Sequence, residues 1–133
     1  GTAISPIHVL TAGHCLDVQN DDGIIDLTPE NVTFNLNFGS DLSNSIKAKK
    51  LDLFPGFTGF LNTIDNDMGV VTLSQPLPAG VPIYPLNRDP VFPDDILTIV
   101  GYGTTGNGIV GYTVPRYPEI KRVGQNQVED TSL

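Results

Sequence analysis

Glycine and proline occur so often in this chain that they limit the length of any regular element. The 133 residues include 14 Gly and 11 Pro, and a proline inside a helix kinks or breaks it. The segments between these residues are rich in Val, Ile and Thr, which favour β-strands. We therefore expect an all-β chain built from short strands and turns rather than from long helices.

Two segments have the pattern of strands with one solvated face. Residues 31–38 predict a half-buried antiparallel strand, because apolar side chains alternate on one face of it: Val32, Phe34, Leu36 and Phe38. Residues 46–53 predict a strand at the edge of a sheet, with these side chains in solvent: Lys47, Lys49 and Lys50. A binding patch is the alternative explanation for the three lysines.

Charge and hydropathy exclude two classes of partner. The formal net charge is −8 and the pI is about 4.3, so we expect no nucleic acid partner, because phosphate backbones bind basic proteins. No apolar run approaches the ~20 residues of a membrane-spanning helix, so we expect no membrane partner. Apolar residues make up 39% of the chain, which is enough for a core of modest size.

The first chemical motif ends an apolar run with a histidine and a cysteine. Ala12 and Gly13 let the backbone turn tightly, and His14 and Cys15 follow at once. A lone histidine beside a turn is more often structural than catalytic. Here the histidine belongs to a longer pattern, His8-Val9-Leu10-Thr11-Ala12-Gly13-His14-Cys15.

This pattern resembles the histidine motif of the trypsin-like serine proteases, which have the chymotrypsin fold. The resemblance implies that His14 is the general base of a Ser-His-Asp triad. In that family the cysteine after the histidine usually forms a disulfide with a cysteine on the preceding strand. Cys15 is the only cysteine here, so either its partner lies upstream of Gly1 or this branch of the family lacks the disulfide.

The second motif places an acidic residue directly before a strand. Asp67 precedes a segment rich in Val and Leu, and alone such an aspartate is usually a turn or cap residue. Beside the His14 motif, residues 66–73 resemble the aspartate motif of the same family, and Ser74-Gln75-Pro76-Leu77 extends the match. The resemblance implies that Asp67 orients the His14 ring. Asp65 has the wrong offset for this role.

The resemblance covers nearly the whole chain and implies its domain organisation. Residues 1–77 would form a first β-barrel that holds both motifs, 78–94 a proline-rich connector, and 95–133 the truncated start of a second barrel. The expected fold is a chymotrypsin-like antiparallel β-barrel, with the first barrel incomplete and only the opening strands of the second.

The nucleophile of the triad has no counterpart in this sequence. The family carries it in a G-D-S-G-G motif after the aspartate, and here the serines after Asp67 are Ser74 and Ser132, neither flanked by those glycines. We expect a fragment whose serine lies in the C-terminal half of the same protease, beyond Leu133. The fragment alone is expected to be inactive.

The resemblance therefore implies a serine endopeptidase that needs no cofactor, acts on protein or peptide substrates, and is secreted or extracytoplasmic. The alternative is a non-catalytic trypsin-like binding module that has lost its nucleophile. A matched His14 and Asp67 favour the enzyme, because a binding module has no chemical need for the pair.

Two further segments leave alternatives open. Residues 17–30 fail as an EF-hand, because Pro29 falls where the last carboxylate is required. A looser calcium loop remains open there, and Asn20 to Gly23 alternatively forms a tight turn between strands. In the aromatic loop 54–60, Phe57 or Phe60 contacts substrate, or both pack the loop.

Overall fold

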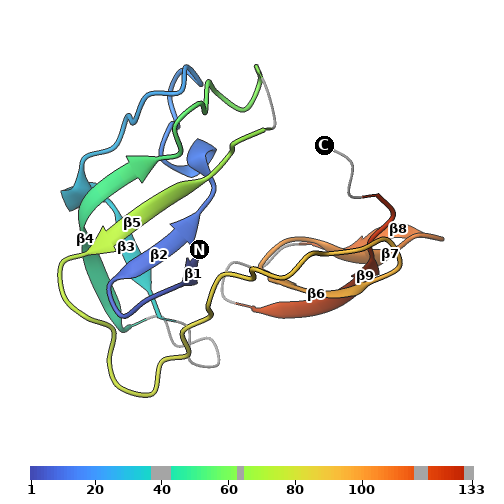
Figure 1. The fold of residues 1–133 in the computed structure, drawn as a ribbon. Helices are drawn as coiled ribbons and strands as arrows, with labels where there is room; N and C mark the ends of the chain where they lie inside the picture. The colour runs from blue at the N-terminus through green and yellow to red at the C-terminus, as the bar shows by residue number, and fades with distance from the viewer. Residues whose placement is uncertain (37–42, 63–64, 116–119, 131–133) are drawn as a thin grey trace. The chain divides into compact units, whose positions relative to one another are not determined.

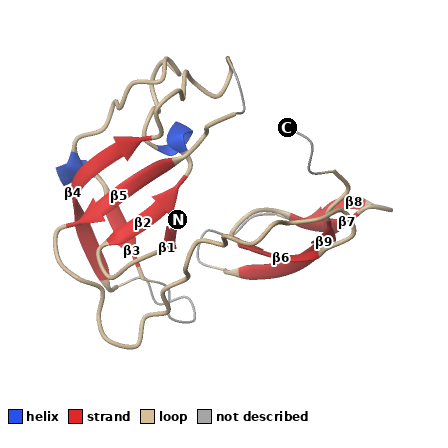
Figure 2. Ribbon diagram, in the orientation of Figure 1, coloured by secondary structure: helices blue, strands red, loops and turns tan. Residues whose placement is uncertain are grey.

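The computed structural model describes residues 1–36, 43–62, 65–115 and 120–130. Its regular structure consists of β-strands and two short 3-10 turns, η1 (Gly13–Cys15) and η2 (Pro29–Asn31) (Figure 2). The all-β class is confirmed. No helix in the described part of the chain is long and apolar enough to cross a membrane.

The chain divides into two compact units. Gly1–Asn35 and Asn44–Leu86 form the first, and the described residues from Asn87 onward belong to the second. This boundary lies inside the predicted connector 78–94. The finer division into 1–77, 78–94 and 95–133 stays a prediction.

The first unit is a five-stranded antiparallel sheet with the order β1-β2-β5-β4-β3 (Figure 1). Its strands are β1 (Thr2–Ala3), β2 (His8–Thr11), β3 (Thr33–Asn35), β4 (Ser45–Leu53) and β5 (Gly69–Leu73). β5 lies between β2 and β4, and Thr11 at the end of β2 pairs with Gly69 at the start of β5. The segments that follow β2 and precede β5 therefore meet at one edge of the sheet.

The sheet curls around a core as half of a barrel, in agreement with the chymotrypsin-like fold that the sequence predicts. Val9 and Val71 pair across β2 and β5, and both are buried. Leu16 and Phe57 join this core from the loops after β2 and β4. The other buried apolar residues of the unit are Ala3, Ile46, Ala48, Leu51, Leu73 and Leu77.

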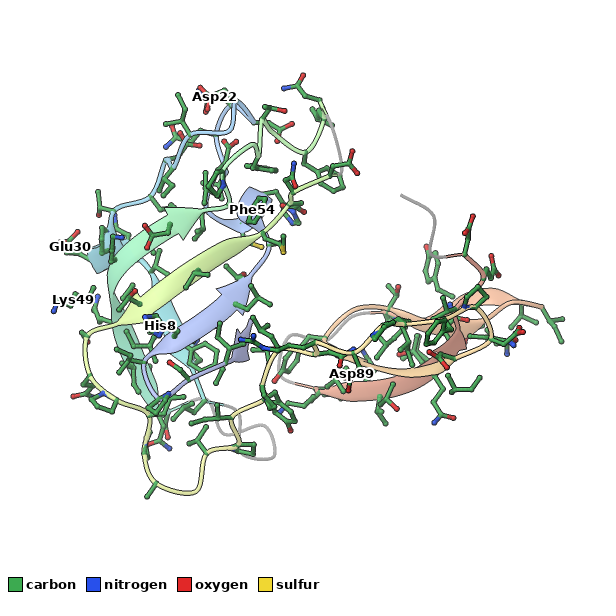
Figure 3. All side chains as sticks on the ribbon, viewed as in Figure 1. His8, Asp22, Glu30, Lys49, Phe54 and Asp89 are labelled. Carbon is green, nitrogen blue, oxygen red and sulfur yellow. The ribbon has the colours of Figure 1, made fainter. Side chains whose placement is uncertain are left out.

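β4 differs from its prediction in one respect. Its three lysines are exposed as expected, and Lys49 points away from the sheet (Figure 3). The strand is not at an edge, however, because β3 and β5 pair with its two sides. An internal antiparallel strand with one solvated face has the same alternation as an edge strand, so the pattern could not separate the two.

A bulge explains why neighbouring lysines face solvent together. The pairing of β4 with β5 shifts between Ala48 and Lys50. The extra residue lets Lys49 and Lys50 both lie outside and returns Leu51 to the core.

The strand predicted over 31–38 is shorter in the structure, where β3 covers Thr33–Asn35. Val32 and Phe34 are half-buried, and Phe38 lies outside the described residues.

The second unit contains two pairs of strands. β6 (Ile96–Gly101) pairs with β9 (Arg122–Gln127), and β7 (Thr105–Asn107) pairs with β8 (Gly111–Val114). β7 and β8 thus form a hairpin in a Gly-rich segment of the chain. The apolar side chains of β6 are exposed on both faces of the strand: Ile96, Leu97, Ile99 and Val100. No residue is buried in the described segments 87–115 and 120–130 of this unit.

Exposed apolar strands predict self-association. Contiguous apolar surface and open strand edges promote intermolecular contacts, so a polypeptide of residues 1–133 alone should form oligomers or aggregates. Light scattering after size exclusion would measure the mass. Val100→Thr with Val123→Thr, a cross-strand pair that keeps β propensity, should lower the mass; a monodisperse wild-type monomer would contradict this account of β6.

Candidate active site

His14 is held at the end of β2 by the 3-10 turn η1. The turn closes through the N–H of Cys15, which donates to the carbonyl of Ala12 (3.2 Å), and the N–H of Leu16, which donates to Gly13 (2.8 Å). Leu16 is 2% exposed and fixes the turn to the core, whereas 47% of the His14 side chain is exposed. The tight turn predicted at Ala12 and Gly13 is therefore present as η1, and it leaves about half of the imidazole exposed.

Asp67 lies beside His14 because it directly precedes β5, whose first residues pair with the end of β2. The backbone reverses at Asn66, which has a φ of +61°; asparagine tolerates this left-handed conformation better than most residues. The N–H of Met68 donates to the carbonyl of Asn66 (2.6 Å), and β5 begins at Gly69. The Asp67 side chain is 15% exposed.

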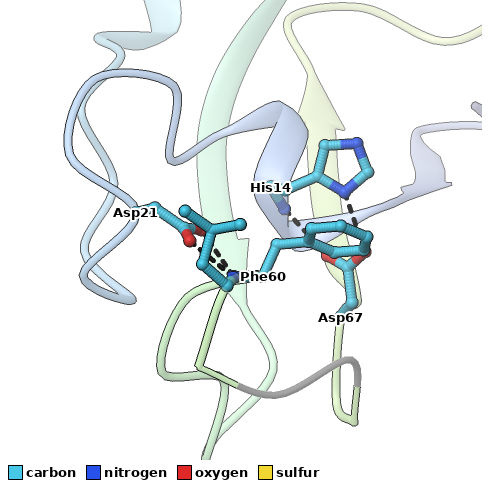
Figure 4. Close-up of polar contacts among 5 residues, drawn as sticks. His14, Asp21, Phe60 and Asp67 are labelled. Carbon is cyan, nitrogen blue, oxygen red and sulfur yellow. Dashed lines mark hydrogen bonds and ion pairs between the residues drawn. The ribbon is translucent and has the colours of Figure 1, made fainter.

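The two side chains are joined at two points (Figure 4). Asp67 Oδ2 lies 2.8 Å from His14 Nδ1, and Oδ1 accepts the backbone N–H of His14 at 2.8 Å. A ring nitrogen that donates to a carboxylate leaves the other nitrogen as an acceptor. In the described part of the chain, His14 Nε2 has no hydrogen-bond partner. The geometry thus suits a proton acceptor whose orientation is set by Asp67.

The surroundings keep Asp67 ionised. Partial burial raises the pKa of this carboxyl, but the backbone N–H and ring of His14, the charge of that ring and the N–H of Gly13 together lower the pKa further, so the net shift is downward. An anionic Asp67 next to the imidazole stabilises the imidazolium that forms when Nε2 takes a proton.

Comparison with known proteins decides the family. The family model described as Trypsin matches residues 1–131. This chain belongs to the trypsin family. The comparison with curated proteins finds no match. The resemblance inferred from the two motifs is confirmed. Trypsin-like proteases act on protein substrates.

The structure separates the two candidate aromatic residues of this trypsin-family chain. Phe57 is 6% exposed and packs in the core. The Phe60 ring lies against His14, with the ring centroids 5.1 Å apart and the planes at 59°, a tilted arrangement that aromatic rings favour. Phe60, at 43% exposed, is therefore the member of the loop that belongs to the site.

Neither downstream serine is placed at the site. Ser74 directly follows the last residue of β5, whereas Asp67 lies just before the first residue of this strand. Five residues of extended strand span about 17 Å, so Ser74 is far from the pair. Ser132 lies outside the described residues. Cys15 is a free, exposed cysteine.

Two carboxylates of the segment 17–30 accept hydrogen bonds from backbone N–H groups of the same segment. Asp17 Oδ2 accepts the N–H of Gly23 (2.7 Å), and Asp26 Oδ2 accepts that of Gln19 (2.7 Å). Asp17 Oδ1 is buried without a partner in the described chain. Calcium takes six to eight oxygen ligands, so one free oxygen does not make a calcium site. No group of three His, Cys, Asp or Glu among the described residues could hold a metal ion. Asn20 to Gly23 forms bends that no strand directly flanks.

The lowered pKa of Asp67 predicts a pH-dependent contribution to stability. Because the folded pKa lies below the unfolded one (~3.9), this contribution is complete above the unfolded value and is lost as pH falls through the folded value. Asp67→Asn should lower the free energy of unfolding by about 1–2 kcal/mol at pH 6, and the difference from wild type should close on acidification.

Urea unfolding of the protein from its full reading frame, from pH 6 to pH 2.5, would measure this difference. Asp89→Asn, which changes an exposed carboxylate, is the matched control and should follow the wild-type profile. Parallel profiles for wild type and Asp67→Asn would show that the carboxylate is not held by His14.

Proposed function

We propose that this chain supplies the general base and its orienting carboxylate to a serine endopeptidase, with the nucleophilic serine outside residues 1–133. The observation that carries the proposal is the two-point contact between Asp67 and His14, which leaves Nε2 of the half-exposed His14 side chain unpartnered among the described residues. Membership of the trypsin family supports it.

The proposed chemistry assigns one proton path to His14. Nε2 accepts the proton of the serine hydroxyl as its oxygen attacks the carbonyl carbon of the scissile peptide bond. The imidazolium then gives this proton to the leaving amine nitrogen when the C–N bond breaks. In the second half of the reaction, Nε2 takes a proton from the water that attacks the acyl-enzyme and gives it to the serine oxygen when the acyl C–O bond breaks. Asp67 stays ionised throughout, in keeping with its lowered pKa.

The nucleophile and the donors for the oxyanion are proposed to come from further chain. The sequence contains no G-D-S-G-G motif, and the exposed apolar residues of β6 offer a surface for additional strands. The substrates are proposed to be proteins or peptides, and the protein is proposed to act in a secreted or extracytoplasmic setting, as trypsin-family proteases often do.

Kinetics of the protein expressed from its full reading frame test this proposal. A fluorophosphonate probe should label one serine outside residues 1–133, and a peptide library should be cleaved. Asp67→Asn should lower kcat by about 10⁴-fold, the loss seen for the triad aspartate in trypsin-type enzymes, and His14→Ala should lower it at least as far. His8→Gln, at the chain's other histidine, should retain the wild-type rate.

Three outcomes would contradict the proposal. A folded protein that neither reacts with the probe nor cleaves peptides would favour the non-catalytic binding module. Labelling of Ser74 or Ser132 would show that the nucleophile lies within this chain. Full activity in His14→Ala would show that another group is the base.

A further inference from the structure

Two loops beside His14 are joined by one carboxylate. Loop 17–26 follows η1, and loop 54–62 follows β4. Asp21 Oδ1 accepts the backbone N–H of Phe60 at 2.5 Å, and Oδ2 accepts that of Leu61 at 2.6 Å (Figure 4). Both oxygens of one side chain thus bind two successive amides, and hydrogen bonds to an ionised acceptor are about twice as strong as neutral ones.

Direct backbone contact brings the loops close enough for this bond. Gly23 and Gly59 both have positive φ, at +80° and +102°. A Cβ at Gly59 would overlap the carbonyl oxygen of Asp21, and a Cβ at Gly23 would lie 2.5 Å from the carbonyl oxygen of Phe57. Only glycine fits at either position, so the two backbones pack against each other without side chains between them.

Loop 17–26 is itself held firmly. Asp17, 3% exposed, accepts the N–H of Gly23 from inside the loop. Asp21 has a φ of +53°, a conformation that costs a non-glycine residue about 1 kcal/mol or more and persists where the surroundings hold it. The backbone that carries the Asp21 carboxylate is therefore held in place by contacts within loop 17–26.

Loop 54–62 depends on that support at its tip. Phe57 anchors the start of the loop in the core, but Phe60 and Leu61 are 43% and 87% exposed. Burial therefore does little to fix the backbone at Phe60, whose ring lies on His14. Among the described residues, the bonds to Asp21 are the polar contacts that tie the backbone of Phe60 and Leu61 to another loop.

We propose that Asp21 is a positioning residue for His14: by holding the amides of Phe60 and Leu61, it keeps the Phe60 ring against the imidazole. Asp67 fixes the direction of Nδ1, and the Phe60 ring restricts the remaining rocking of the imidazole. The imidazolium formed during turnover lies within the ~6 Å over which an aromatic ring attracts a cation. The catalytic consequence rests on the proposed function; the structural one does not.

Histidine NMR of the protein from its full reading frame tests the structural part. Residues 1–133 contain two histidines, and the ring resonances that disappear in His14→Gln are assigned to His14. Asp21→Ala should move the His14 Cε1–H and Cδ2–H resonances in the same direction as Phe60→Ala, because the first lets the Phe60 ring leave His14 and the second deletes the ring, so both reduce its ring current at His14. Asp22→Ala is the matched control and should leave them unchanged, since among the described residues Asp22 bonds within its own loop, to Ile24 and Asn20.

Peptide hydrolysis tests the catalytic part. Small displacements of a catalytic group can cost up to about 100-fold, and we expect Asp21→Ala to lower kcat about tenfold with little change in KM. Asp21→Asn retains one acceptor oxygen and should fall between Asp21→Ala and wild type. In a Phe60→Ala background, Asp21→Ala should cause little further loss, because the ring through which it acts is gone.

The outcomes separate the two proposals. Movement of the His14 resonances in Asp21→Ala, without peptidase activity in the wild type, would support the role of Asp21 and overturn the proposed function. Wild-type His14 resonances in Asp21→Ala, while Phe60→Ala shifts them, would overturn the role of Asp21. If Asp21→Ala does not fold, the same resonances in Asp21→Asn decide, and wild-type shifts there with wild-type kcat would overturn it.

Discussion

The antiparallel pairing of β2 with β5 is the interaction on which the first unit depends. It places Val9 opposite Val71 in the core and ends at Thr11 and Gly69. His14 and Asp67, 53 residues apart in sequence, lie just beyond this last pair. A slip of one residue would turn the buried valines outward, so the burial that stabilises the sheet also sets the register that brings the two residues together.

The loops at this edge of the sheet are held by aspartate side chains that accept hydrogen bonds from backbone N–H groups. Asp67, Asp21 and Asp17 each accept backbone N–H groups that the strands leave unpaired. Of the three non-glycine residues with positive φ in the described chain, Asp21 and Asn66 lie in the loops beside the candidate site, and Asp94 lies in the second unit. Such conformations persist where neighbouring contacts hold them, as the bonds of Asp21 to the amides of Phe60 and Leu61 do here.

The sequence predicted the fold class and the His14–Asp67 pair because both are recorded in local patterns, namely alternation, turn residues and two contiguous motifs. It did not predict the contact of Asp21 with Phe60, since the acceptor binds backbone N–H groups that every residue except proline has. It left Phe57 and Phe60 equivalent, because only the packed loop shows which ring faces the core. It placed β4 at an edge, since one-sided solvation has the same pattern in internal strands.

The central claim is that His14 is the base for a serine outside residues 1–133. The most direct measurement is a crystal structure of the protein from its full reading frame after reaction with a fluorophosphonate. The account predicts that the phosphonylated serine oxygen lies about 3 Å from His14 Nε2 and that Asp67 still binds Nδ1. A labelled serine far from His14, or an imidazole turned away from Asp67, would contradict it.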